Sequence, residues 1–288
     1  METFTSEVFN TLWNNNCCGC NSVINYIIVE YEFMSEDWGI ANEDYKHSHS
    51  TADLIITNPA KFIMKAIVGH DTWTTSDAMI RGNATEFAVQ EKLLDDTVDI
   101  SELAKQDYID RGGIGEKEMK FAMACANVMY EELISRQLHT PTDYQQRLDE
   151  ANFMGCTRNC RGFIDWTFGN NGWIVDGKST GRVPSKPTST ATRQQALYWG
   201  LTGKKYRMAL LYASDKRCNF VEIPQQELED QLQIVIRSFK YIESMMTRFT
   251  TLAEWINAFP YPDFDNGWNY DEELKQLTIE KWRSLWQN

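Results

Sequence analysis

Two aspartates and a lysine are the residues of this chain whose types and spacing could do chemistry together. Asp165 lies in the run GFIDWTF, and Asp176 and Lys178 lie in the following run WIVDGKS. Alternate residues of a β-strand face the same side, so Asp176 and Lys178 point the same way if the second run is a strand. Carboxylate oxygens suit Mg²⁺ or Mn²⁺, and an adjacent ammonium group offsets charge that develops on a reacting phosphate. The spacing therefore predicts a divalent-metal site suited to displacement at phosphorus.

A β-hairpin is the element that must bring these residues together. Two apolar runs, 162–168 and 173–175, flank the sequence Gly-Asn-Asn-Gly, whose residues tolerate positive φ. We expect the first strand to carry Asp165 and the second to end at the Asp-Gly-Lys motif. The backbone carbonyl of Gly177, between the second aspartate and the lysine, then offers one more neutral oxygen to a metal ion.

Two helices are predicted to complete this arrangement. The segment 190–199 lacks Gly and Pro, and Gln194 and Tyr198 lie four residues apart, on one face of a helix. The segment 76–94 also reads as a helix, in which small residues allow close packing and bring Glu86 against the hairpin. Glu86 thereby becomes a candidate for a third carboxylate ligand.

The rest of the chain predicts further helices and strands around one core. Ser48 or Ser50 is expected to cap a short helix, and Pro59 interrupts it. Residues 95–118 are acidic and contain glycine, which predicts an exposed excursion. Further helices are expected over residues 1–15, 61–68, 117–137, 224–249, 252–258 and 272–286. Further strands are expected over residues 23–33, 145–152, 206–213 and 220–223.

Composition places the chain among globular proteins. It has 288 residues, of which 42% are hydrophobic, enough for one sizeable core. No apolar run approaches the roughly 20 residues that span a bilayer, and the first residues do not have the pattern of an export signal. Seven cysteines, an odd number, fit a reducing compartment better than a set of disulfides. We therefore expect a cytoplasmic protein with no membrane partner.

Cysteines leave one alternative open. Cys17, Cys18 and Cys20 form a cluster, and Cys156 and Cys160 form a close pair. A closed metal–thiolate site needs about four ligands at suitable spacing, and the partners for such a site are not evident. Ordinary buried or free thiols are the favoured interpretation.

Charge is distributed unevenly along the chain. The net charge of −13 by itself argues against a nucleic-acid partner. Residues 177–214, however, contain no acid, and their cations form one basic stretch that starts inside the predicted site. This distribution favours a confined path for DNA, although a solvated face remains the alternative. The cations are Lys178, Arg182, Lys186, Arg193, Lys204, Lys205 and Arg207.

The order of the motifs resembles the PD-(D/E)XK nuclease superfamily, in particular its RecB-like, RecE-like and lambda-exonuclease-like members. The matching pieces span about residues 48–213: an RG-x(3)-E helix, GFID, a hairpin, IVDGKST and a helix with Q-x(3)-Y. SHSTADLIITNPAKF further upstream is similar to the start of RecE-type phage exonucleases. The resemblance implies an α/β (α+β) fold with an αβββαβ restriction-endonuclease-like core, a central mixed sheet flanked by helices, and helical N- and C-terminal additions. It also implies a single nuclease domain over residues 1–288, with its core at about 48–223 and a helical extension at 224–288.

The resemblance assigns roles to the residues singled out above. It implies that Asp165 and Asp176 bind one or two Mg²⁺ or Mn²⁺ ions, that Lys178 is the catalytic lysine, and that Gln194 and Tyr198 lie near the active site. Structural alternatives stay open, because a hairpin-end ion pair would explain the acids and a polar core pair would explain the glutamine and tyrosine.

Two departures from the family pattern concern the metal. RecB-like and RecE-like members usually have histidine where this chain has Glu86, whereas lambda-exonuclease-like members have a glutamate there; either side chain binds a divalent cation. Iron–sulfur members need cysteines near the C-terminus, where this chain has Trp268 and Tyr270. No iron–sulfur cluster is therefore expected.

By analogy with exonucleases that hold a DNA end, Arg81, Ser48 and Ser50 are candidate contacts for a terminal phosphate. Arg182, Lys186, Arg193, Lys204 and Lys205 are candidate contacts elsewhere on DNA. Trp166, Trp173 and Trp199 could stack on bases, but core packing is the favoured role.

The function that the resemblance implies is a metal-dependent deoxyribonuclease, most simply an exonuclease that resects DNA ends in phage-type recombination. An endonuclease or an end-trimming repair nuclease is the alternative within this fold, and a non-catalytic DNA- or protein-binding relative is the alternative of another class. Implied partners are DNA, a single-strand annealing protein and, in a ring-forming relative, further copies of the chain.

Overall fold

The computed structural model of the chain describes residues 45–70, 76–260, 262–265, 267–268 and 271–286. All of them belong to one compact unit, Ile40–Asn288. The helix predicted over 1–15, the strand predicted over 23–33 and the cysteine cluster at 17–20 lie outside the described residues, as does Tyr270.

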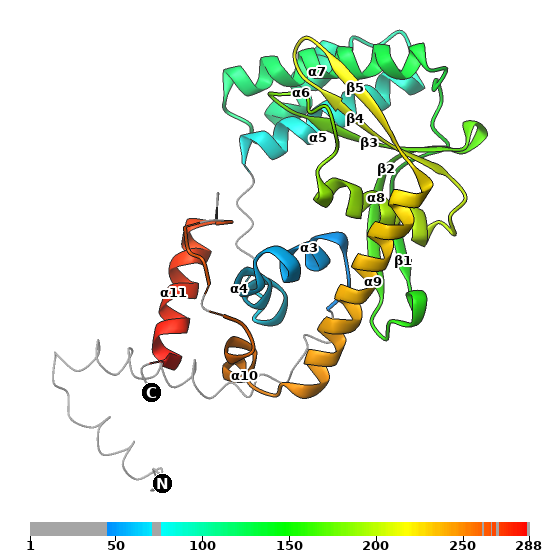
Figure 1. Ribbon diagram of the computed structural model, residues 1–288. Helices are drawn as coiled ribbons and strands as arrows, with labels where there is room; N and C mark the ends of the chain where they lie inside the picture. The colour runs from blue at the N-terminus through cyan, green and yellow to red at the C-terminus, as the bar shows by residue number, and fades with distance from the viewer. Residues whose placement is uncertain (1–44, 71–75, 261, 266, 269–270, 287–288) are drawn as a thin grey trace, which may run out of the picture. The chain divides into compact units, whose positions relative to one another are not determined.

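A five-stranded mixed sheet lies at the centre of the fold, with the spatial order β1-β2-β3-β4-β5 (Figure 1). Only β3 and β4 are parallel, and the other neighbours are antiparallel. A mixed sheet flanked by helices is what the sequence predicts. The strands are β1 (Asp143–Glu150), β2 (Cys160–Phe168), β3 (Trp173–Ser179), β4 (Arg207–Ala213) and β5 (Cys218–Ile223).

The predicted hairpin forms at β2 and β3. A single turn of 3-10 helix, η3 (Gly169–Asn171), joins the strands, and Gly172 adopts φ +71°, a left-handed conformation that favours glycine. The ladder between the two strands is short, with Trp166 opposite Val175, and it ends before the Asp-Gly-Lys motif. Beyond that point β3 pairs with β4 instead. The candidate residues therefore lie where β2 and β3 separate.

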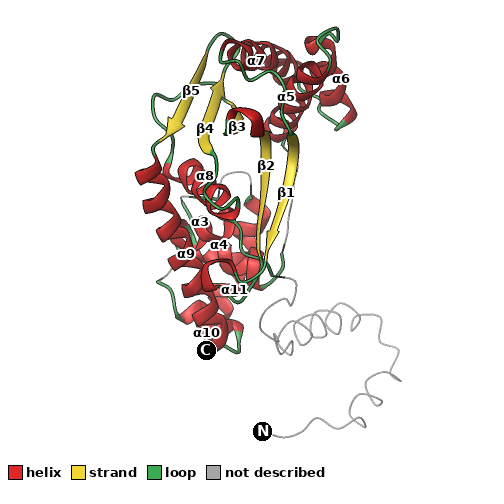
Figure 2. Cartoon of the chain, turned by 90° about the vertical axis from the view of Figure 1, so that its right-hand side faces the viewer, coloured by secondary structure: helices red, strands yellow, loops and turns green. Residues whose placement is uncertain are grey.

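Three helices cover one face of the sheet (Figure 2). They are α5 (Asp77–Leu94), α6 (Ile100–Asp110) and α7 (Glu116–Ser135). The prediction of an exposed excursion over 95–118 is wrong, because α6 lies within it. Asp99 caps this helix, and Ile100, Ala104 and Tyr108 are buried at a spacing of four residues, which the abundant acidic residues obscured in the sequence.

The opposite face is covered by α3 (His49–Thr57), α8 (Ser189–Leu201) and α9 (Gln225–Arg248). Because helices cover both faces, β4 is buried at every position after its first, which explains its continuous apolar sequence. Trp166 and Trp199 are buried in the two cores, as the favoured interpretation of the tryptophans expects.

A third apolar core lies away from the sheet, where the C-terminal part of α9 meets shorter helices. These are α4 (Pro59–Phe62), the π-helical segment η1 (Ile63–Ile67), α10 (Leu252–Asn257) and α11 (Glu272–Trp286). The predicted helix over 61–68 is thus two joined pieces. Within the described residues, no helix combines the length and apolar character that a membrane span requires.

Candidate active site

Asp165 and the Asp-Gly-Lys motif lie side by side at the point where β2 leaves β3. The backbone N–H of Gly177 donates a hydrogen bond to Asp165 Oδ2 over 2.9 Å. Lys178 Nζ lies 2.6 Å from Asp176 Oδ2. The structure thus brings together the two acids and the lysine that the sequence singled out, and their catalytic roles stay predictions.

Glu86 joins this group from the buried side of α5, because Gly177 has no side chain. A Cβ built on Gly177 would lie 2.8 Å from the Trp166 ring and 3.5 Å from Glu86 Cγ. Any larger residue would collide with the tryptophan and stand beside the glutamate. Glycine between the aspartate and the lysine therefore permits the approach of α5. We call Glu86, Asp165, Asp176 and Lys178 the acid cluster.

Asp176 is the member of the acid cluster whose buried negative charge is least well compensated. Its side chain is 1% exposed, its Oδ2 is paired with Lys178, and its Oδ1 is buried with no partner. It is the only carboxylate with a buried oxygen that lacks a partner among the described residues. Since leaving a buried charged group unsatisfied costs several kcal/mol, one lysine at close range is an incomplete solution. A bound cation would supply what is missing.

The acids also raise one another's proton affinity. Burial, followed by the charge of Asp176, raises the pKa of Asp165 to about 7. Burial, followed by the charge of Asp165, raises the pKa of Glu86. Burial alone would lower the pKa of Lys178, but the neighbouring aspartates outweigh it and raise that pKa. The lysine is therefore an ammonium at neutral pH, and the carboxylates compete for too little positive charge.

Gln145 is a site residue that the sequence did not reveal. It lies on β1 between residues that pair with Ile164 and Trp166, which puts it opposite Asp165. Its φ is +48°, in the left-handed region that residues other than glycine seldom adopt. Its Nε2 lies 3.2 Å from Glu86 Oε2 and 3.5 Å from Asp165 Oδ1. In the sequence, the only signal for this residue was its polar side chain within a predicted strand. Strained backbone of this kind clusters at functional sites.

The predicted glutamine–tyrosine pair forms on α8. Gln194 Nε2 donates to the hydroxyl oxygen of Tyr198 over 2.9 Å. The Tyr198 ring packs on β2, where a Cβ at Gly162 would lie 2.8 Å from it. Burial, followed by the charge of Asp176, raises the pKa of Tyr198. The pair thus lies within electrostatic reach of the acid cluster.

The residue types of the acid cluster fit a hard divalent cation. Glu86, Asp165 and Asp176 offer only oxygen ligands, which Mg²⁺ and Mn²⁺ prefer. The buried Oδ1 of Asp176, which has no partner, is the specific observation in favour of this fit. A role for the Gly177 carbonyl oxygen stays a prediction.

The candidate DNA contacts divide into two groups: side chains that have structural partners, and exposed side chains, which we call the open group. Arg81 pairs with Glu118 and donates to Ser179, and Arg193 is buried against Asp53. Ser48 caps α3, as predicted. The ammonium of Lys204 lies 4.6 Å from the Trp199 ring centroid. The open group consists of Ser50, Arg182, Lys186, Lys204 and Lys205. The structure leaves the open group accessible and gives Arg81 and Arg193 structural partners; contact with DNA stays a prediction for all of them.

A second group of metal-ligand residue types lies elsewhere, at His47, Cys156 and Glu243. One ligand atom from each lies within 4.8 Å of the others, a spacing that no group in the acid cluster meets among the described residues. We call these residues the histidine cluster. His47 Nε2 lies 3.0 Å from Glu243 Oε1, which also accepts from the backbone N–H groups of Thr157 at 2.7 Å and Arg158 at 2.8 Å.

Comparisons with known proteins give limited help. No protein-family model matches the chain, and no curated protein matches it in sequence. Among solved structures, a crystal structure named "Putative exonuclease" from Eubacterium rectale is 15% identical, with a TM-score of 0.49, covering 77% of this chain and 88% of that one. The crystal structure of SSO0001 is 11% identical, with a TM-score of 0.32, covering 65% of this chain and 86% of that one. At these scores neither likeness establishes an activity for this chain.

Proposed function

We propose that the chain is a metal-dependent deoxyribonuclease of the PD-(D/E)XK type, and most simply an exonuclease that resects DNA ends. The observation that carries the proposal is the buried Asp176 carboxylate, whose Oδ1 has no partner and whose Oδ2 has only Lys178, beside two further carboxylates. A purely structural ion pair has no reason to leave a carboxylate in this condition. A site that binds a cation does.

Each residue of the acid cluster has a task in this reaction. Glu86, Asp165 and Asp176 would hold Mg²⁺ or Mn²⁺, which supplies an activated water and stabilises the oxygens of the phosphodiester that is cleaved. Lys178, held as an ammonium, offsets the negative charge that develops on the phosphate. Gln145 keeps Glu86 and Asp165 at a fixed separation through its carboxamide.

The outer elements of the site serve positioning. Tyr198 and Gln194 present a hydroxyl and a carboxamide from α8. Exposed cations of the basic stretch provide contacts for the DNA backbone. This function implies DNA as partner and a reducing, cytoplasmic setting; a role in phage-type recombination or repair, a single-strand annealing partner and self-association are parts of the same proposal.

A nuclease assay tests the proposal directly. Purified protein is incubated with 5′- and 3′-labelled linear duplex, single strands and closed circles, in Mg²⁺, Mn²⁺ or EDTA, beside Lys178→Ala. We expect metal-dependent loss of linear DNA that the variant lacks. Cleavage of closed circles would favour an endonuclease. Metal-dependent degradation of none of these substrates would favour the non-catalytic binding relative instead.

A further inference from the structure

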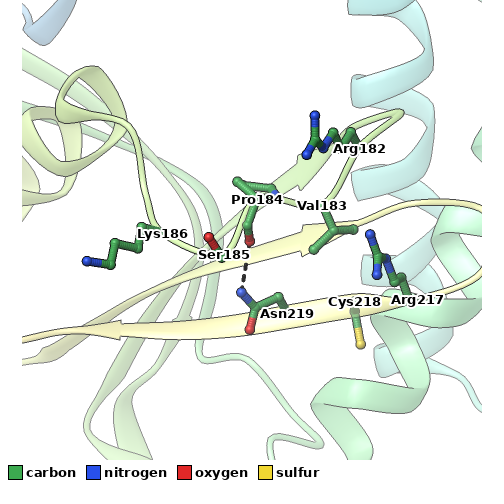
Figure 3. Close-up of a pocket in the computed structure, with 8 residues that line it drawn as sticks. All are labelled: Arg182, Val183, Pro184, Ser185, Lys186, Arg217, Cys218 and Asn219. Carbon is green, nitrogen blue, oxygen red and sulfur yellow. Dashed lines mark hydrogen bonds between the residues drawn. The ribbon is translucent and has the colours of Figure 1, made fainter.

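A pocket of about 650 Å³ opens beyond the C-terminal ends of the parallel strands β3 and β4 (Figure 3). Residues 182–186, which follow β3, form one wall, and Arg217 with the start of β5 forms the other. The backbone N–H of Thr180 donates to the carbonyl of Ala213 over 2.8 Å, and Asn219 Nδ2 donates to the carbonyl of Pro184 over 3.0 Å. These bonds hold the two walls against each other, so the pocket is a fixed feature of the sheet edge.

The chemistry of the pocket is cationic. Arg182, Lys186 and Arg217 line it, and no acidic residue does. All three are exposed, and none forms an ion pair with any residue that the structure describes. Elsewhere in this protein, whose net charge is −13, arginines such as Arg81 and Arg207 are paired with acids. Unpaired cations around one pocket are suited to an anionic ligand.

The spacing of the cations indicates more than one anionic group. Figure 3 shows Arg182 and Arg217 flanking Val183 at one end, with Lys186 extending from the other end. Cations at two ends of one pocket suit successive phosphates of a nucleic-acid strand. The pocket also lies close to the acid cluster along the chain, since only three residues separate Lys178 from Arg182.

We propose that this pocket holds the phosphodiester backbone of the DNA strand that enters the acid cluster, with Arg217 as a contact from a second loop. The proposal rests on the proposed function, because it takes DNA as the substrate. Its cations contact phosphates and no base edges, so they contribute affinity without sequence preference. A nucleotide or inorganic phosphate shares the same chemistry, and the test must separate these ligands from a strand.

The test measures the salt dependence of DNA binding. Arg182→Ala, Lys186→Ala and Arg217→Ala are combined in a Lys178→Ala background with Mg²⁺, so that labelled DNA stays intact. The control combines Arg237→Ala, Lys240→Ala and Arg248→Ala on the exposed side of α9, which removes the same charges. Binding is titrated at several salt concentrations with duplex and single-stranded oligonucleotides of unrelated sequence.

Each lost phosphate contact lowers the slope of log K against log salt by about 0.9 for duplex or about 0.7 for a single strand. We expect the pocket variant to lose about two to three such contacts for every sequence, with affinity at low salt at least about tenfold weaker, and the control to match its parent. An unchanged slope in the pocket variant overturns the proposal. So does inorganic phosphate that binds the parent at millimolar concentration, but not the pocket variant, without displacing DNA from the parent, because the pocket then takes a single anion and no DNA.

Failure of the pocket and failure of the proposed function give different results. A parent protein that binds no DNA at any salt concentration overturns both. If the parent binds DNA and the wild type cleaves it, but the slope is unchanged in the pocket variant, only the proposal for the pocket is overturned.

Discussion

The acid cluster and the histidine cluster both gather residue types that bind metals, but their hydrogen bonding differs. Distance alone favours the histidine cluster, whose ligand atoms all lie within 4.8 Å. Its polar atoms are satisfied, however. Glu243 Oε1 accepts from two backbone N–H groups and contacts His47 Nε2, which therefore carries the proton, and the Tyr45 hydroxyl lies 3.1 Å from His47 Nδ1. Burial lowers the pKa of His47, which keeps the ring neutral.

The acid cluster shows the opposite condition. Its carboxylates are farther apart, with the Gln145 carboxamide between Glu86 and Asp165, yet Asp176 Oδ1 is buried without a partner and Oδ2 has only Lys178. The difference teaches that the accounting of hydrogen bonds distinguishes a site that needs a ligand from a structural junction. The histidine cluster joins α9 to the segment before β2, whereas the acid cluster keeps a buried carboxylate oxygen without a partner.

Asp176→Ala is the change with the largest expected effect. Cleavage should fall by at least about 10²- to 10³-fold, since the variant lacks the carboxylate with the unpartnered oxygen. The rise in melting temperature on adding Mn²⁺ should disappear, while the melting temperature in EDTA should not fall. The measurements are a gel-based nuclease assay and thermal melts. Near wild-type rates would show that the ligand assignment is wrong.

Glu243→Ala should affect stability instead of metal binding. It leaves the buried His47 ring and the backbone N–H groups of Thr157 and Arg158 without their acceptor, so we expect the free energy of unfolding to fall by about 1–3 kcal/mol in urea melts. Asp230→Ala, an exposed change on the same helix, should cost much less. If the Mn²⁺-induced stabilisation of the acid cluster persists unchanged in Glu243→Ala, the comparison holds. If the wild type binds zinc stoichiometrically and Glu243→Ala does not, the comparison is refuted.

Stability in EDTA should depend on pH through Asp165. The folded-state pKa is raised to about 7, above the ordinary value of 3.8, so the folded protein binds this proton more tightly than the unfolded chain. The free energy of unfolding should therefore fall as pH rises from about 4 to about 7 and level off above that. Asp165→Asn should flatten this part of the profile, and Mg²⁺ should reduce the loss at pH 8. Identical profiles for variant and wild type in urea melts would exclude a charge conflict at Asp165.

Gln145→Gly should produce the smallest effects, and they should have opposite signs. Glycine relieves the left-handed backbone, worth about 1 kcal/mol, so thermal stability in EDTA should rise. Loss of the carboxamide that spaces Glu86 and Asp165 should weaken Mn²⁺ binding several-fold in calorimetry. Gln145→Ala keeps the strain and loses the amide, so it should weaken Mn²⁺ binding without the gain in stability. Equal stability of the two variants would show that the backbone stores no strain.

Local patterns were sufficient to predict the elements that carry the site. The hairpin followed from two apolar runs around Gly-Asn-Asn-Gly, and the Gln194–Tyr198 pair followed from helical spacing. Where acidic residues masked an apolar spacing, as in α6, the same reasoning failed. The histidine cluster was not predicted, because His47 lies about 110 residues from Cys156 in sequence and about 200 from Glu243, and only packing brings them together.

The sequence by itself determined that two aspartates and a lysine share a hairpin, because strand periodicity and turn chemistry are local properties. Only the tertiary structure decided that Gly177 lets α5 bring Glu86 to them, that Gln145 lies opposite Asp165, and that Asp176 Oδ1 is buried without a partner. These features depend on which strands separate and which helices cover them. Hydrogen-bond satisfaction is a property of the whole packed environment, so a one-dimensional pattern contains no direct record of it.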